Sequence, residues 1–249
     1  MIRALIFDLD DTLISERQYI ESGYQHIAKV VGNKYGLDTE IVYHDLISLF
    51  NESSKNVFNR LLDKYGIEYD DELIFTLVEE YRNHFPKIEF YPDVLPCLEY
   101  LRSKDIKLGI ITDGYANAQR QKLKAVKAEN YFDEIIVTDE LGREFWKPHP
   151  KAYEIMQKRL NVKFGEMVCV GDNPGKDFYI KNLYPITTVR VNRDGFYSKA
   201  SYFEEVKEDI AMKSLSEIWF IEQILEVKHE NLRSKINPKT GISNIIRCR

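Results

Sequence analysis

Five short apolar segments each end in a cluster of polar residues, and this feature constrains the fold more than any other. They read RALIFD, KLGIITDG, EIIVTDE, MVCVGDN and ITTVRVN. Short runs rich in isoleucine, valine and threonine predict strands, and the lack of polar alternation indicates burial on both faces, as in a parallel sheet. Helical periodicity lies between them, in DVLPCLEYLRSK, YANAQRQKLKAVKA and KAYEIMQKRL. This alternation predicts a doubly wound, Rossmann-like α/β fold.

The interval from Ile14 to Tyr91 has helical periodicity and almost no strand signal. The first expected helix has Ser15 as its N-cap and ends at Gly32. Three more are expected, in TEIVYHDLISLFN, NVFNRLLDKYG and DDELIFTLVEEYRNHF. This pattern predicts a small α-helical cap domain inserted after the first strand.

The whole chain is therefore divided into three parts. We expect an α/β catalytic core formed by residues 1–14 and 92–227, a helical cap at 15–91 and a basic C-terminal tail at 228–249. The segment SLSEIWFIEQILEV should form the last helix of the core. The tail carries six basic residues and one acid, which favours a solvated segment, with a docking segment for an acidic neighbour as the alternative.

Composition narrows the class of protein. The 249 residues are 44% hydrophobic and 30% charged, as in an ordinary soluble protein. No apolar run approaches the ~20 residues that span a bilayer, so no membrane partner is expected. The net charge of −5 argues against nucleic acid as a partner. Three cysteines far apart and no secretory signal favour the cytoplasm, and the oligomeric state is left open.

Three carboxylates follow the first apolar run, at Asp8, Asp10 and Asp11. Carboxylates this close repel one another, and burying them at the end of a strand is costly. A compensating charge must come from elsewhere, and a cation is the simplest source.

Other reactive side chains also fall at the ends of predicted strands. Because the carboxyl ends of parallel strands meet at one edge of a sheet, where ligands bind, these side chains should lie close together. Each alone also fits a turn or a solvated side chain, so it is their shared location that favours chemistry. The set is Asp8, Asp10, Thr112, Lys147, Asp172 and Asp177.

These residues carry a resemblance to the haloacid dehalogenase superfamily of phosphohydrolases, over roughly residues 2–225. Four of its signature motifs appear in order. They are DLDDT at 8–12, Thr112 in IITDG, Lys147 in WKPHP and GDNPGKD at 171–177. A helical insert directly after the first motif is similar to the cap of one class of the superfamily.

The resemblance implies a mechanism for a Mg²⁺-dependent phosphatase. Asp8 would be the nucleophile that forms an aspartyl-phosphate, and Asp10 the general acid and base. Thr112 and Lys147 would hold the phosphoryl oxygens.

The resemblance also implies a Mg²⁺ site. Asp8 and Asp172 would bind Mg²⁺ directly, and the main chain of Asp10 would add a carbonyl oxygen. Asp177 would orient the waters that the metal retains.

The substrate is expected to be a small phosphorylated metabolite, with a sugar phosphate favoured. Candidates to bind it lie within the first two motifs and in the middle of the cap, although an ordinary polar helix surface also explains the cap residues. The candidates are Asp11, Thr12, Asp113, Gly114, Lys55, Asn56 and Arg60. The stripe of Phe50, Phe58 and Leu62 favours cap core over a substrate pocket.

Rival interpretations share part of this pattern. A dehalogenase of the same superfamily lacks an acid at the position of Asp10, whereas a sugar phosphomutase shares all of these residues. A receiver-type phospho-acceptor domain has similar strand-end groups but no helical insert. A catalytically idle binding protein is disfavoured because every catalytic position is intact.

Overall fold

One parallel sheet of six strands organises the computed structural model, which describes residues 1–219. The strand order is β3-β2-β1-β4-β5-β6. The strands are β1 (Ala4–Phe7), β2 (Lys107–Thr112), β3 (Glu134–Val137), β4 (Met167–Gly171), β5 (Thr187–Val191) and β6 (Ile210–Met212). The five predicted strands and the α/β fold are confirmed, and β6 is an addition at the sheet edge.

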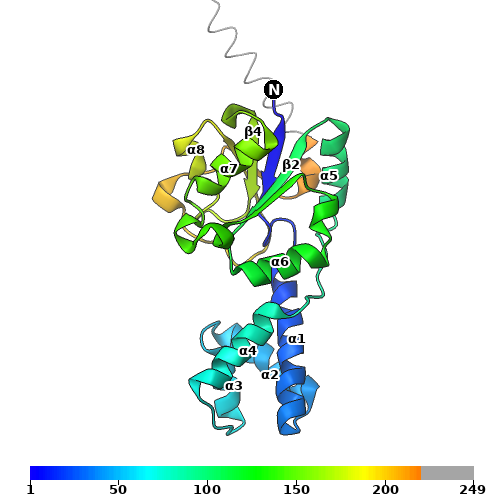
Figure 1. Cartoon of the computed structure of the whole chain (residues 1–249), viewed down its shortest axis with the longest axis vertical. Coiled ribbons are helices and arrows are strands. Elements are labelled where there is room, and N and C mark those ends of the chain that lie inside the picture. Colours follow the sequence, from blue (N-terminus) through cyan, green and yellow to red (C-terminus); the bar gives the residue numbers. More distant parts are fainter. Residues whose placement is uncertain (220–249) are drawn as a thin grey trace, which may run out of the picture.

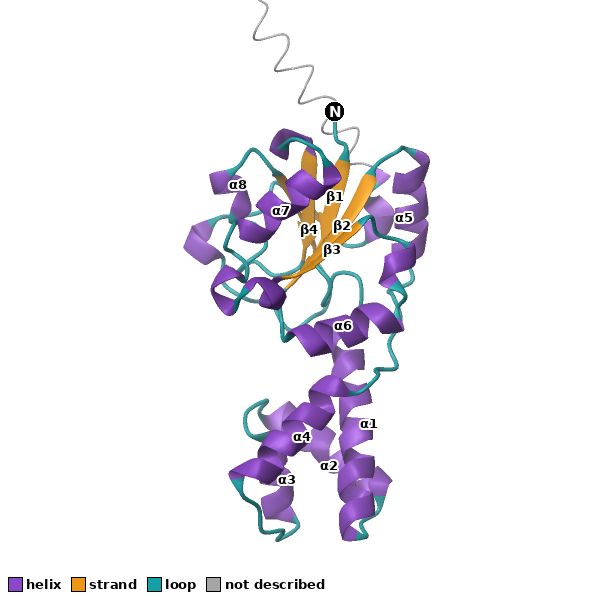
Figure 2. Cartoon of the chain, in the orientation of Figure 1, coloured by secondary structure: helices purple, strands orange, loops and turns teal. Residues whose placement is uncertain are grey.

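Helices cover both faces of the sheet (Figure 2). In β1, Leu5 and Phe7 pack into the cluster that contains residues of α5 and α6, whereas Ala4 and Ile6 pack into the cluster that contains α7 and α8. Both faces of the strand are therefore buried, as its unbroken apolar run predicted. These helices are α5 (Val94–Ser103), α6 (Ala116–Ala125), α7 (Lys151–Leu160) and α8 (Ile180–Leu183).

Short 3-10 helices complete the described part of the core. They are η1 (Ala128–Asn130), η2 (Thr138–Leu141), η3 (Arg143–Phe145), η4 (Phe164–Glu166), η5 (Phe203–Glu205) and η6 (Leu215–Glu217). The predicted last helix begins near η6, but most of it lies outside the described residues, as does the basic tail at 228–249. Over residues 1–219, no helix combines the length and apolarity needed to cross a bilayer.

Four helices lie beyond the carboxyl ends of the strands (Figure 1). They are α1 (Glu16–Tyr35), α2 (Thr39–Glu52), α3 (Val57–Lys64) and α4 (Asp71–Asn83). All four contribute to a hydrophobic cluster of their own, in which Ile27, Leu46, Leu61 and Leu77 are buried. The position of this bundle places its helices next to the strand ends where the candidate residues lie.

Helix α1 begins after Ser15 as predicted, but it does not end at Gly32. It continues to Tyr35, and Gly36 ends it in the left-handed conformation with φ +66°. Gly32 serves packing instead, because a Cβ there would lie 2.7 Å from Cγ2 of Thr39. The sequence shows a glycine at both positions and does not reveal which one ends the helix.

Two chain segments that lie side by side connect the bundle to the sheet. Ile14 and Phe90 form an antiparallel bridge, and the amide of Tyr91 donates a hydrogen bond to the carbonyl of Leu13 at 2.9 Å. Both connections therefore lie next to the end of the acidic loop that follows β1.

Candidate active site

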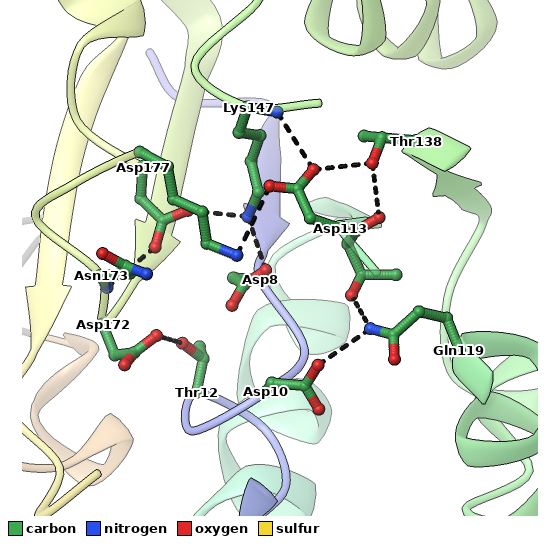
Figure 3. A network of polar contacts seen from close by, with 12 residues as sticks. Asp8, Asp10, Thr12, Asp113, Gln119, Thr138, Lys147, Asp172, Asn173 and Asp177 are labelled. Atoms are coloured by element: carbon green, nitrogen blue, oxygen red, sulfur yellow. Dashed lines mark hydrogen bonds and ion pairs between the residues drawn. The ribbon is translucent and has the colours of Figure 1, made fainter. Parts of the chain in front are cut away.

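The ammonium group of Lys147 lies between two buried carboxylates (Figure 3). Its Nζ is 2.5 Å from Oδ1 of Asp8 and 2.7 Å from Oδ1 of Asp177. Burial alone would lower the pKa of Lys147, but the charges of Asp177 and Asp8 raise it well above its usual value. Burial likewise opposes the charge of Asp8, yet Lys147 holds the pKa of Asp8 below its usual value. Asp8 therefore remains a carboxylate, which is the form that can attack phosphorus.

Three buried carboxylates meet beside this lysine. One oxygen each from Asp8, Asp172 and Asp177 lies within 4.8 Å of the others. Burial and the charges of Asp177 and Asp8 raise the pKa of Asp172 to about 9, which indicates negative charge that Lys147 does not offset. Hard oxygen donors with excess negative charge fit a divalent cation such as Mg²⁺. The cluster therefore fits the metal site expected from the sequence.

The position of Asp177 depends on Gly171, the last residue of β4. Oδ2 of Asp177 accepts a hydrogen bond from the amide of Asn173 at 2.9 Å. A Cβ on Gly171 would lie 2.6 Å from Cγ of the same carboxylate. The glycine at the strand end thus makes room for the carboxylate that pairs with Lys147.

Asp10 points away from the three-carboxylate cluster and toward α6 (Figure 3). Nζ of Lys122 is 2.6 Å from its Oδ1, and Nε2 of Gln119 donates to its Oδ2 at 2.9 Å. The same Gln119 nitrogen lies 2.5 Å from Oγ1 of Thr112 at the end of β2. Two side chains one helical turn apart therefore hold the Asp10 carboxylate in a fixed direction.

The carboxylate of Asp11 serves the fold. Its Oδ1 accepts from the amide of Glu16 at the start of α1, and its Oδ2 accepts from the amide of Phe196. The first of these bonds caps the first turn of α1, where the side chain of Ser15 makes no capping bond. The second connects the loop after β1 to the segment after β5. The side chain of Asp11 is therefore used by the fold, and only its main chain is left for the substrate role expected from the sequence.

Asp113 supports the loop that carries Lys147. Its Oδ1 accepts from Oγ1 of Thr138 at 2.7 Å and from the amide of Lys147 at 3.1 Å. Its Oδ2 lies 3.4 Å from Nζ of Lys176, a second ammonium near the site. Thr12 is fully buried, and its hydroxyl lies 3.5 Å from Oδ1 of Asp172. Thr12 thus contacts the carboxylate cluster.

A cavity of about 780 Å³ lies between this site and the helical bundle. Core residues and bundle residues line it together. From the core come Asp10, Asp113, Gly114, Tyr115, Ala118, Gln119, Lys122, Trp146, Lys147, Asn173, Lys176 and Tyr197. From the bundle come Glu16, Tyr19, Ile20, Tyr24, Phe50, Ser54, Asn56, Val57, Phe58, Asn59, Ile74, Val78, Tyr81 and Arg82.

The bundle residues chosen from the sequence lie in different places. Asn56 lines the cavity, whereas Lys55 and Arg60 are not among its lining residues. The guanidinium of Arg60 donates to the carbonyls of Leu49 and Ser53, which stabilises the end of α2. A role for Asn56 in substrate binding stays a prediction.

The aromatic stripe in the bundle is split between core and cavity. Leu62 is fully buried, as expected of cap core. Phe50 and Phe58 are only partly buried and line the cavity.

Residues 5–180 match the family model described as "Haloacid dehalogenase-like hydrolase". The chain is a haloacid dehalogenase-like hydrolase. It is 34% identical to a glyceraldehyde 3-phosphate phosphatase of Methanopyrus kandleri over 78% of this chain and 85% of the relative. It is 29% identical to the enzyme of that name from Methanocaldococcus jannaschii over 88% and 96%.

Solved structures agree on the fold of this hydrolase. A HAD phosphatase from Thermococcus onnurineus superposes with a TM-score of 0.57 at 28% identity, covering 88% of this chain and 97% of the other. A "putative beta-phosphoglucomutase" from Thermotoga maritima has a TM-score of 0.64 at 23% identity, with 89% and 99% covered. The family match and the named relatives make the chain a phosphoric monoester hydrolase.

Three polar side chains of the hydrolase were not singled out from the sequence. Gln119 and Lys122 lie three positions apart just after the second motif, so helical spacing could have placed both on the face toward the strand ends. Lys176 lies inside the fourth motif, between Asp172 and Asp177, and no feature of the sequence distinguishes it from a solvated lysine.

Proposed function

We propose that this hydrolase is a Mg²⁺-dependent phosphatase that acts on a small sugar phosphate through an aspartyl-phosphate on Asp8. The observation that carries the proposal is the buried Lys147 ammonium between Asp8 and Asp177, next to the third carboxylate of Asp172. The glyceraldehyde 3-phosphate phosphatases among its relatives support a sugar phosphate as the substrate.

The nucleophile, the Asp8 carboxylate, and the phosphate group that it attacks are both negatively charged. Asp8 is buried and ionised, so it needs no base to activate it. Lys147 can hold a phosphoryl oxygen while it contacts Asp8, which offsets the repulsion between the carboxylate and the phosphate dianion. Mg²⁺, held by Asp8 and Asp172, would supply further positive charge to the phosphoryl oxygens when bound.

Asp10 is placed to move the proton. Its carboxylate lines the cavity and is held by Lys122 and Gln119. In its protonated form it can give a proton to the leaving oxygen of the ester, and the carboxylate that results can then take a proton from the water that attacks the phosphorylated Asp8. A dehalogenase has no acid to match Asp10, and a phospho-acceptor domain gains nothing from rapid hydrolysis, so this residue favours a phosphatase over both.

A phosphomutase needs a place for a second phosphate at the bundle end of the cavity. The basic residues that line the cavity, within residues 1–219, are Arg82, Lys122, Lys147 and Lys176. The three lysines form ion pairs with carboxylates of the core, and the guanidinium of Arg82 lies over the ring of Tyr115 at 3.5 Å. This distribution of charge supports hydrolysis over transfer to a second sugar phosphate.

Phosphate release with and without Mg²⁺ tests the proposal. We expect release from glyceraldehyde 3-phosphate or ribose 5-phosphate that requires Mg²⁺ and that Asp8→Asn abolishes. Asp63→Asn, the same change at an exposed acid on α3, is the matched control and should retain activity. Equal release by wild type and Asp8→Asn would refute the assignment of the nucleophile.

A further inference from the structure

The cavity is larger and more aromatic than a triose phosphate requires. Its volume of about 780 Å³ lies within the ~300–1,000 Å³ range of pockets that enclose drug-sized ligands. A three-carbon sugar phosphate is polar along its whole length and has no flat apolar surface to bury. The walls of the cavity therefore offer contacts that such a substrate leaves unused.

The bundle side of the cavity is a continuous set of aromatic rings. The ring of Tyr24 lies 5.8 Å from that of Phe50, 6.3 Å from that of Phe58 and 5.7 Å from that of Tyr81. Tyr81 in turn lies 5.5 Å from the ring of Tyr19. All five residues line the cavity. We name this set, Tyr19, Tyr24, Phe50, Phe58 and Tyr81, the aromatic wall.

Most of the basic side chains that line the cavity within residues 1–219 come from the core, whereas the aromatic wall comes from the bundle. Three lysines, Lys122, Lys147 and Lys176, come from the core and pair with its carboxylates. Around Phe50 and Phe58, the bundle residues in the lining add the neutral polar groups of Ser54, Asn56 and Asn59. The charged bundle residues in the lining are Glu16 and Arg82, and Nζ of Lys122 lies 4.3 Å from the ring of Tyr19. The core end thus suits a phosphoryl group, and the bundle end suits a neutral ring with a few hydrogen-bonding groups.

We propose that the substrate is a phosphomonoester whose alcohol carries a flat unsaturated ring, with the phosphoryl group at Asp8 and the ring against the aromatic wall. This inference rests on the proposed phosphatase function and narrows its substrate class. Stacking of one base on an aromatic side chain changes affinity about fivefold to 150-fold. A ring-bearing ester should gain a factor of this size over an ester of the same sugar without the ring.

Uridine 5′-monophosphate and ribose 5-phosphate form a matched pair of probes. Both present a phosphoryl group on the 5′ oxygen of ribose, and they differ in the uracil ring. With Mg²⁺ present, we expect kcat/KM for phosphate release to be at least about fivefold higher for uridine 5′-monophosphate. Glyceraldehyde 3-phosphate, measured alongside, should resemble ribose 5-phosphate.

Two substitutions locate the effect in the aromatic wall. Phe58→Leu and Phe50→Leu remove a ring but keep an apolar side chain, and each should lower the ratio of the two kcat/KM values at least threefold. Phe75→Leu is the matched control, because Phe75 on α4 is 64% exposed and does not line the cavity. It should leave the ratio unchanged.

The outcomes separate the two proposals. Equal kcat/KM for the matched pair, or a preference that neither wall variant reduces, would overturn the inference while leaving the phosphatase assignment intact. No phosphate release from any of the three esters with Mg²⁺ would overturn the proposed function and the inference with it.

Discussion

Asp172 should destabilise the metal-free protein at neutral pH, and Asp172→Asn should relieve this. The pKa of Asp172 is raised from 3.8 to about 9, first by burial and then by the charge of Asp177. Between these values the unfolded chain gives up a proton that the folded chain retains, so stability falls as pH rises from about 4 to 9. Each pH unit in that window costs about 1.4 kcal/mol, which amounts to about 4 kcal/mol at pH 7.

The side-chain amide introduced by Asp172→Asn keeps an oxygen for the hydroxyl of Thr12, which lies 3.5 Å from Oδ1 of Asp172. We therefore expect the variant to be about 2–4 kcal/mol more stable than wild type at pH 7 in EDTA. The difference should vanish below about pH 3, where the Asp172 carboxyl is protonated in both the folded and the unfolded state. Urea unfolding followed by circular dichroism at several pH values measures it.

Magnesium should remove most of this difference in stability. At a concentration 100 times its Kd, a ligand that binds only the folded state adds about 2.7 kcal/mol. Wild type should gain this stability, and Asp172→Asn should gain little because one of the three carboxylates is lost. A variant no more stable than wild type at pH 7 in EDTA would refute the reasoning.

Two further predictions concern residues that position the catalytic carboxylates. Gly171→Ala should displace Asp177, lower Mg²⁺ affinity about 10- to 100-fold and cost about 1–3 kcal/mol of stability. Gly165→Ala, where the nearest atom to the new Cβ would be 3.7 Å away, should do neither; isothermal titration and urea unfolding check both. Lys122→Met should lower kcat up to about 100-fold because it releases Asp10, and Lys122→Arg should restore part of the loss. Steady-state kinetics measure both, and an unchanged kcat in Lys122→Met would show that the ion pair has no catalytic effect.

The fold was predictable where one local pattern has one outcome. The run from Ala4 to Phe7 has no polar residue, and the strand it forms is buried on both faces. β6 was not predicted, because a strand of three residues has too short a pattern to separate from a loop. The end of α1 was misplaced because Gly32 packs against Thr39, a contact that only the folded bundle creates.

The charged groups of the site were predictable from the sequence, whereas the residues that position them were not. Asp8 and Lys147 stand at strand ends, and a parallel sheet brings such ends together. The hold of Lys122 on Asp10 depends on how α6 lies across the sheet, which no local pattern specifies. Phe50 and Phe58 stand at a helical spacing in the sequence but lie on separate helices, α2 and α3. Periodicity alone does not separate a core face from a cavity wall.

The bridge between Ile14 and Phe90 lies just before the first residue of α1, so it can act as the pivot about which the whole helix turns. The helix has 20 residues and therefore extends about 30 Å. A rigid turn of ~10° about the bridge would carry its far tip through about 5 Å. The same turn would displace Asp11, which accepts a hydrogen bond from the first residue of the helix and precedes it in the chain next to Asp10. A change in the angle of α1 would therefore affect both the entry of the substrate and the alignment of Asp10, the proton donor.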